Sequence, residues 1–339
     1  MIIYPEANCK IVIKSPAKIN LFLYVIGRRD NGYHDLFTLM SCVDLYDEIA
    51  LTFNQPATYI TCNNSELPKD ETNLAFKAVT LFNKYFISED YYNSSFLHGV
   101  KIDIKKNIPV GAGLGGGSSN AASVLKAMNQ FYGNPFSLDK LMEMGLKLGA
   151  DVPFFILGGS AVAEGVGEKL TPLPLFETLS ELEQLEASRT KNKKNDKKSI
   201  YILLFYPGLS ASTAEVYKNL DLALTKSVKS NNKCLLKSPD IIQRLNFIKE
   251  LVHNDLELTT CDLYPEIGLF KNELLYYLDD KIDLSEILLI PQKILMTGSG
   301  STFFCLFSDY EKAQLCFNEL SEKWRFTKRQ VFITSFVRF

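Results

Sequence analysis

The feature that most restricts what this 339-residue chain can fold into is a run of glycines, five of the seven residues from 111 to 117. Their backbone can take positive φ values and approach a ligand without Cβ clashes. Ser118, Ser119 and Asn120 follow and can cap a helix, because their side chains accept hydrogen bonds from free N–H groups. A glycine loop leading into a helix N-terminus suits phosphate. The alternative is a flexible turn before a capped helix, but the glycine density and the Ser-Ser-Asn sequence favour phosphate binding.

The type of phosphate loop is narrowed by what surrounds the glycines. A Walker loop requires Gly-Lys-Ser/Thr, and no lysine follows these glycines. The spacing of Gly111, Gly113 and Gly116 does fit a dinucleotide-binding fingerprint. However, Pro109 and the residues at 105–107 separate the loop from the preceding strand, and no strand ending in Asp or Glu follows about 20 residues later. A dehydrogenase is therefore only a minor alternative.

Composition excludes several other classes of protein. A hydrophobic content of 46% with 22% charged residues is typical of a soluble globular chain. The net charge of −2 gives no global attraction to nucleic acid or anionic lipid, and no apolar run approaches the roughly 20 residues that span a bilayer. The N-terminus does not resemble a signal peptide. Seven scattered cysteines without a CxxC pair indicate reduced thiols and no zinc site. We therefore expect a cytoplasmic protein with no nucleic-acid or membrane partner.

Apolar patterning predicts a mixed α/β chain. Helical spacing covers 75–85 and 119–131, and a turn is expected at 30–32. Strands are expected at 10–13, 19–26, 45–53, 100–104, 200–206, 293–296 and 303–307. The basic run at 189–198 is either a nucleic-acid patch or a solvated loop, and the loop is favoured. We expect domains at 1–178 and 199–339, joined by a charged insertion or linker at 179–198.

Three further segments carry candidate functional residues. Lys18 and Asn20 open an apolar strand and lie on the same face of it, because side chains alternate along a strand. Lysines are rarely buried without an acidic or phosphate partner. Asp151 stands among apolar residues and is either a helix or turn cap or a desolvated functional carboxylate; taken alone, the cap is favoured. Gly298 and Gly300 form a second glycine turn, either a plain hairpin or a place where a ligand passes close to the backbone.

Together these segments resemble the three motifs of the GHMP kinases, in order, from residue 15 to residue 302. Within that superfamily they are most similar to the branch that phosphorylates 4-diphosphocytidyl-2-C-methyl-D-erythritol. The matching stretches are SPAKINLFL from Ser15, NGYHDL from Asn31, IPVGAGLGGGSSNAAS from Ile108, GADVPFF from Gly149, NDLE from Asn254 and TGSGST from Thr297. Six segments in order are far more specific than one glycine loop.

The resemblance implies a two-domain α/β (α+β) fold, with a ribosomal-protein-S5-like N-terminal domain, a ferredoxin-like C-terminal domain and the active site between them. ATP, as MgATP, and cytidine diphosphate methylerythritol are the implied ligands. Asp151 would accept or orient the proton of the attacking hydroxyl, and Lys18 would hold Asp151 and that hydroxyl in place. The implied ATP-binding residues are Asn73, Lys106, Pro109, Val110, Gly111, Ala112, Gly113, Leu114, Gly115, Gly116, Gly117, Ser118 and Ser119. The implied substrate-binding residues are Asn20, Tyr33, which would stack on cytosine, His34, which would hydrogen-bond its edge, and Asn120.

Some departures keep alternatives open. The stretches 179–198 and 226–237 are longer and more basic than the family pattern leads us to expect, and Met40 stands where an aromatic residue near the cytosine is expected. No carboxylate ligand for magnesium is assigned. Tyr33 and His34 can also simply follow the turn at Gly32. Another GHMP kinase, acting on homoserine or mevalonate, and a non-catalytic nucleotide-binding protein are the competing hypotheses; the Tyr33-His34 pair argues against the first, and the presence of Lys18 and Asp151 against the second.

Overall fold

The computed structural model describes residues 9–88, 99–173, 200–221, 236, 247–281, 294–307 and 309–337. The predicted insertion at 179–198 lies outside these residues, as does the stretch 226–237 apart from Leu236. No helix of the described residues is long and apolar enough to cross a membrane.

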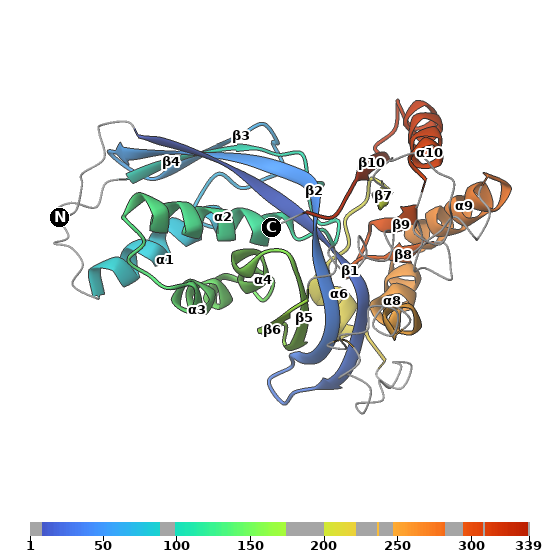
Figure 1. The fold of residues 1–339 in the computed structure, drawn as a ribbon, viewed down its shortest axis with the longest axis horizontal. Helices are drawn as coiled ribbons and strands as arrows, with labels where there is room; N and C mark the ends of the chain where they lie inside the picture. Colours follow the sequence, from blue (N-terminus) through green and yellow to red (C-terminus); the bar gives the residue numbers. More distant parts are fainter. Residues whose placement is uncertain are drawn as a thin grey trace, which may run out of the picture. The chain divides into compact units, whose positions relative to one another are not determined.

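The larger sheet has six strands in the order β3-β4-β2-β5-β6, with β1 paired to β2 (Figure 1). β3 is parallel to β4, whereas β2 is antiparallel to β4 and to β5. Its strands are β1 (Lys10–Arg28), β2 (His34–Gln55), β3 (Tyr59–Cys62), β4 (Gly99–Lys105), β5 (Ser160–Gly165) and β6 (Lys169–Pro172).

Two of these strands are longer than the sequence pattern predicts. The two strands expected at 10–13 and 19–26 are parts of the single strand β1, which continues through Pro16. β2 begins at His34 rather than at residue 45, because its first half is buried on both faces and therefore lacks the alternation that reveals a half-exposed strand. The turn between them is confirmed, with Gly32 at φ 84° and its N–H donating to Arg29 O at 2.9 Å.

Four helices of unit 1 pack against one another on one side of β3 and β4 (Figure 1). They are α1 (Leu74–Ser88), α2 (Gly116–Phe131), α3 (Leu138–Leu148) and α4 (Val152–Leu157). Buried Phe82 and Phe86 of α1 pack with Phe136 in the segment between α2 and α3. The helices predicted at 75–85 and 119–131 are therefore confirmed, and both are slightly longer than expected.

The smaller sheet has four strands in the order β10-β7-β9-β8, all antiparallel. β9 covers the residues predicted for it, and its five side chains are all buried. The strands are β7 (Tyr201–Tyr206), β8 (Leu295–Met296), β9 (Phe303–Phe307) and β10 (Gln330–Thr334), and the helices of this region are α6 (Thr213–Lys218), α8 (Leu256–Leu263), α9 (Pro265–Lys281) and α10 (Tyr310–Lys323).

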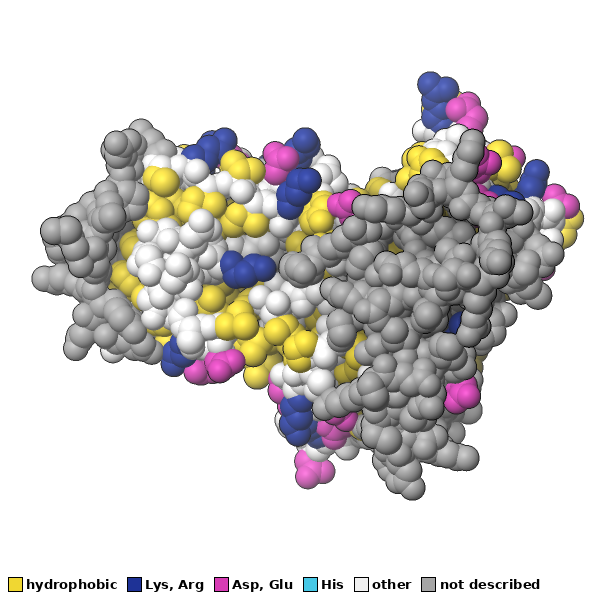
Figure 2. All heavy atoms as spheres, in the orientation of Figure 1, with side chains coloured by type: hydrophobic (Ala, Val, Ile, Leu, Met, Phe, Trp, Pro, Cys, Tyr) yellow, Lys and Arg dark blue, Asp and Glu magenta, His cyan; other side chains and the backbone are white. Residues whose placement is uncertain are grey.

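The chain divides into two compact units. Unit 1 comprises residues 1–17, 45–110 and 115–158, and unit 2 comprises residues 18–44, 111–114 and 159–339. The domain boundaries expected from the sequence stay a prediction. On the described part of the face in Figure 2, Lys and Arg side chains are scattered among Asp and Glu and do not form one basic field.

Candidate active site

The glycine loop takes the conformation that its composition predicts. Gly111, Gly113 and Gly115 have φ values of 64°, 77° and 70°, in the left-handed region that favours glycine. α2 begins at Gly116 with Gly115 at its N-cap, so no capping side chain satisfies the first N–H groups of the helix. The expectation that residues 118–120 cap this helix is wrong, because they already lie inside its first turns. The N-terminus of α2 therefore presents N–H groups directly after the loop, as a phosphate site requires.

Gly117 is the glycine of this loop whose presence the fold does not explain. It lies in the first turn of α2 and is exposed, and its φ is not in the left-handed region. Among the described residues, a Cβ built on it would meet Leu74 Cδ1 at 3.7 Å, an ordinary van der Waals contact. Alanine would fit this position among the described residues, so neither packing nor backbone conformation explains the glycine.

The second glycine turn, residues 297–302, packs against the first half of the loop within unit 2. A Cβ on Gly113 would lie 2.3 Å from Thr297 O and 2.8 Å from Gly300 O, closer than any real contact. Thr302 N donates to Ala112 O at 3.2 Å. This turn joins the antiparallel strands β8 and β9, and it supports the backbone of the loop as well.

The segment 254–257 (NDLE), to which the sequence analysis assigned no role, holds this second turn in place. Asn254 Nδ2 donates to Met296 O at 2.7 Å and to Gly298 O at 2.8 Å. Glu257 Oε2 accepts a hydrogen bond from Met296 N at 2.9 Å. A buried asparagine that bonds two carbonyls of one turn restricts the turn to a single conformation.

Lys18 and Asn20 lie on the same face of β1, as predicted, and both side chains are buried, with Lys18 only 4% exposed. Lys18 Nζ donates to Asn20 Oδ1 at 2.6 Å. The Asn20 amide also donates from Nδ2 to Thr38 Oγ1 at 2.8 Å, and its backbone N–H donates to Thr297 Oγ1 at 2.9 Å. The lysine ammonium is thus held beside the second glycine turn by a chain of hydrogen bonds from β1, β2 and residue 297.

Asp151 occupies the N-cap position of α4, but its side chain makes no capping hydrogen bond. The side chain of this half-buried residue does not cap α4 in the structure, so the expected helix cap is wrong, and a turn cap stays a prediction. Gly149, two residues before Asp151, lies near the start of α2 within unit 1, because a Cβ built on it would be 3.9 Å from Ser118 Oγ. Lys18 belongs to unit 2, and its pairing with Asp151 stays a prediction.

The predicted cytosine-binding residues follow the turn between β1 and β2. Tyr33 is 62% exposed, whereas His34 is buried. Burial, and then the positive charge of Arg28, lowers the pKa of His34 from 6.5, which favours the neutral ring with one donor and one acceptor nitrogen. The His34 ring lies 5.2 Å from that of Tyr217 in α6, with 30° between their planes. Sequence reasoning missed Tyr217, because 183 positions separate it from His34.

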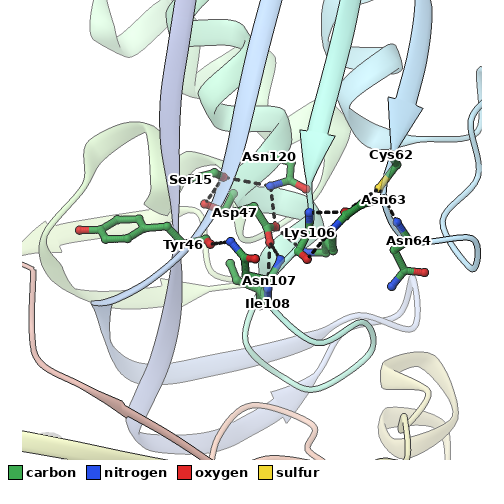
Figure 3. Close-up of polar contacts among 11 residues, drawn as sticks. Ser15, Tyr46, Asp47, Cys62, Asn63, Asn64, Lys106, Asn107, Ile108 and Asn120 are labelled. Atoms are coloured by element: carbon green, nitrogen blue, oxygen red, sulfur yellow. Dashed lines mark hydrogen bonds and ion pairs between the residues drawn. The ribbon is translucent and has the colours of Figure 1, made fainter. Parts of the chain in front are cut away.

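Lys106 and Asn120, two further predicted residues, take part in a polar cluster of unit 1 shown in Figure 3. Lys106 Nζ is paired with Asp47, a fully buried carboxylate that the sequence analysis missed. Asn120 Nδ2 also donates to Asp47, at 2.9 Å, and Ser119 Oγ accepts from Ser15 Oγ at 2.8 Å. Of the two serines that follow the glycines in α2, Ser118 is partly exposed and Ser119 is buried.

Asn73 is placed by its own hydrogen bonds at the start of α1. Its Oδ1 accepts from Ala75 N at 2.9 Å, and its Nδ2 donates to Pro68 O at 2.7 Å. The side chain therefore organises the turn before α1, a structural use of both ends of the amide. Its predicted place near adenosine stays a prediction.

Comparison with known proteins agrees with this geometry. Residues 73–159, which contain the glycine loop and Asp151, match the model of the GHMP kinases N terminal domain. The 4-diphosphocytidyl-2-C-methyl-D-erythritol kinase of Clostridium kluyveri is 37% identical over 324 residues, which cover 96% of this chain and 99% of that protein.

Solved structures are similar in the same way. A crystal structure of 4-(cytidine 5'-diphospho)-2C-methyl-D-erythritol kinase has 28% identity and a TM-score of 0.67, covering 97% of this chain and 100% of that one. Homoserine kinase from Cytophaga hutchinsonii shares the fold at 17% identity, with a TM-score of 0.64 and coverage of 99% and 98%. The expected mixed α/β fold of the GHMP kinases is confirmed. The chain belongs to the family of 4-diphosphocytidyl-2-C-methyl-D-erythritol kinases, within the GHMP kinases.

Proposed function

We propose that this chain transfers the γ-phosphate of ATP to the 2-hydroxyl of 4-diphosphocytidyl-2-C-methyl-D-erythritol, a step of non-mevalonate isoprenoid precursor synthesis. The observation that carries the ATP-binding part is Gly117, an exposed glycine in the first turn of α2 that neither packing nor backbone conformation requires. The names of the relatives supply the second substrate. We propose a cytoplasmic location and no nucleic-acid partner as part of the same function.

In this proposal the phosphates lie against the loop 111–117 and the N-terminus of α2. Free N–H groups and the helix dipole favour the negative charge there, and the Ser118 hydroxyl adds a donor. Magnesium arrives as part of MgATP, where phosphate oxygens already supply ligands. Phosphoryl transfer depends on such positioning and charge neutralisation more than on covalent chemistry.

Asp151 acts as the base or orienting group for the attacking hydroxyl, and Lys18 holds the hydroxyl and the carboxylate. Two observations support these roles. Asp151 stands two residues after Gly149, whose Cβ would lie 3.9 Å from Ser118 Oγ at the start of α2. The Lys18 ammonium is fixed by Asn20 next to a glycine turn. A well-placed general base contributes about 10²–10⁴-fold to the rate.

Tyr33, His34 and Tyr217 recognise the cytosine. The exposed Tyr33 ring is accessible for stacking, which is worth about 1–3 kcal/mol per base in nucleic-acid complexes. A neutral His34 offers a donor and an acceptor to the edge of the base. Tyr217 adds a second aromatic face beside His34. Asn20 and Asn120 complete the proposed substrate contacts, and Asn73 and Lys106 the proposed adenosine contacts.

The test is ADP release by the purified chain with MgATP, comparing 4-diphosphocytidyl-2-C-methyl-D-erythritol with mevalonate and homoserine. Release with the cytidine compound alone supports the proposal. Release with mevalonate or homoserine instead keeps a GHMP kinase but overturns the substrate. Measurable ATP binding without turnover of any of the three points to a non-catalytic nucleotide binder.

Asp151→Asn separates chemistry from binding. We expect it to bind ATP nearly as the wild type does and to lose about 10²–10⁴-fold in kcat. A variant that turns over at a near-normal rate contradicts the role assigned to Asp151. Tyr33→Ala is the matching test of the substrate site: its KM for the cytidine substrate should rise while its KM for ATP stays unchanged, and an equal rise of both speaks against stacking.

A further inference from the structure

The Asp47 carboxylate is the centre of the polar cluster in Figure 3. Asp47 lies in β2 and is 0% exposed. Its Oδ1 accepts from Asn107 N at 2.8 Å and from Ile108 N at 2.9 Å. Its Oδ2 accepts from Asn120 Nδ2 at 2.9 Å and is paired with Lys106 Nζ. A buried carboxylate is costly unless its oxygens are bonded and its charge is paired, and both conditions are met here.

These donors come from both ends of the glycine loop. Ile108 lies three residues before Gly111 and Asn107 four residues before it, whereas Asn120 lies in α2, three residues after Gly117. A single side chain of β2 therefore connects the segment that enters the loop to the helix that leaves it. Ser15 of β1 extends the connection, because its hydroxyl accepts from Asn120 Nδ2 at 3.1 Å and donates to Ser119.

The location of Lys106 makes this connection relevant to anion binding. A Cβ on Gly116 would lie 2.6 Å from Lys106 Nζ, so the ammonium sits against the first residue of α2. The N-terminal end of a helix favours anions and disfavours cations. Burial lowers the pKa of Lys106, while the charge of Asp47 raises it. A buried ammonium at this end of a helix therefore depends on Asp47 for its charge and its position.

We propose that Asp47 is a positioning residue for nucleotide binding, which holds Lys106 and both ends of the loop 111–117 in the conformation that accepts ATP. The inference rests on the proposed ATP site. Asp47 itself need not touch the nucleotide, because it is fully buried. Its substitution should thus affect ATP far more than the alcohol substrate.

The test is Asp47→Asn in the full chain, assayed by ATP titration calorimetry and by the KM values for both substrates. Asparagine keeps the size and one acceptor oxygen, but it removes the charge and turns an NH2 group toward existing donors. We expect ATP to bind about 10–100-fold more weakly, the factor for losing one charge-assisted hydrogen bond. The KM for the cytidine substrate should rise less than the ATP affinity falls, because Asp47 is linked to the proposed substrate contacts only through Asn120.

Asn129→Ala is the matched structural control. Asn129 is also a buried polar residue of α2, and its amide bonds both the N–H and the carbonyl of Phe136 at 3.0 Å. It lies nine residues beyond Asn120, or about 13 Å along the helix axis. We expect it to lower the melting temperature and leave both KM values unchanged. If Asp47→Asn behaves like this control, with lower stability and normal ATP affinity, the proposal is overturned.

Ser15→Ala decides the question if Asp47→Asn does not fold. It removes the hydroxyl that supports Ser119 and Asn120 and keeps the Asp47–Lys106 pair intact. A rise of about two- to fivefold in the KM for ATP, the loss expected for one neutral hydrogen bond, supports the proposal if it exceeds the rise in the KM for the cytidine substrate. An unchanged KM overturns it.

The ATP site itself is checked separately with the wild type and with Gly117→Ala. Failure of the wild type to bind ATP refutes the proposed site. If the wild type binds ATP and Gly117→Ala weakens binding, but Asp47→Asn binds normally, only the positioning role is refuted.

Discussion

The two glycine turns of this chain use the same residue for different reasons. In the turn 297–302, Gly298 and Gly300 have φ values of 58° and 84°, and a Cβ on either would come within about 3 Å of neighbouring atoms, Lys18 Nζ at 3.0 Å and Met296 Sδ at 2.7 Å. In the loop 111–117, Gly113 is constrained in the same way, but Gly117 is not. Glycines that the fold requires and a glycine that it does not require stand four residues apart.

The difference separates architecture from ligand binding. Gly113 allows the backbones of the two turns to approach one another, so substituting it should damage the fold first. Gly117 allows something other than the protein to approach, so substituting it should damage binding alone. The comparison therefore yields opposite predictions for chemically identical substitutions.

The largest effect is expected for Gly113→Ala. The new methyl group would lie 2.3 Å from Thr297 O, and alanine must adopt φ 77°. Left-handed backbone costs about 1–2 kcal/mol and overpacking about 1–3 kcal/mol, so we expect a loss of about 2–5 kcal/mol in the free energy of unfolding. Urea unfolding measures it. A stable Gly113→Ala protein would mean that the two turns do not pack as described.

Gly298→Ala is expected to act on turnover more than on stability. Its methyl group would lie 3.0 Å from Lys18 Nζ, the far end of a flexible side chain that can move. The left-handed backbone costs about 1–2 kcal/mol, and displacement of the ammonium by about 1 Å should lower kcat about 10–100-fold. Steady-state kinetics with both substrates varied measures this. A normal kcat would argue against a catalytic role for Lys18.

Gly117→Ala should produce the opposite pattern. Alanine fits its helical backbone, so we expect a gain of about 0.4–1 kcal/mol in the free energy of unfolding through the unfolded state. The KM for ATP should nevertheless rise about tenfold, because the methyl group keeps the phosphate from the N–H groups it bonds.

The matched control for Gly117→Ala is Gly268→Ala in α9, another helical glycine whose Cβ would make an ordinary contact, with Cys261 Cβ at 3.4 Å. It should leave the KM for ATP unchanged. Equal KM values in both variants would remove the reason for a ligand at Gly117.

The smallest effect is a dependence of stability on pH. Neither glycine turn should contribute to it, because residues 111–117 and 297–302 contain no side chain that titrates near neutrality. The contribution should come from His34. Its pKa is lowered by burial, so the unfolded chain binds the proton first as the pH falls through 6.5, and the folded state loses stability there. The free energy of unfolding should fall more between about pH 7.5 and about pH 5.5 for the wild type than for His34→Gln. The differences among the glycine variants should be the same at both values.

Local pattern predicted the parts of the site that depend on neighbours in sequence. Glycine density predicted the positive φ values of 111–115, and strand alternation predicted the shared face of Lys18 and Asn20. The sequence pattern places the start of α2 three residues late, because the serines resemble capping residues, whereas the helix begins after Gly115, which has no capping side chain. Equally local grounds favour a helix or turn cap for Asp151, and its side chain does not cap α4.

What the sequence by itself determined about this protein is its family, the positions of its loops and most of its candidate residues, because these are written in short segments whose residue types have direct conformational consequences. Only the tertiary structure decided the partners. Asp47 bonds Lys106, 59 residues away, and His34 lies against Tyr217, 183 positions away. A carboxylate or a ring in an apolar segment carries no local sign of such distant contacts, since chain folding and burial bring the groups together.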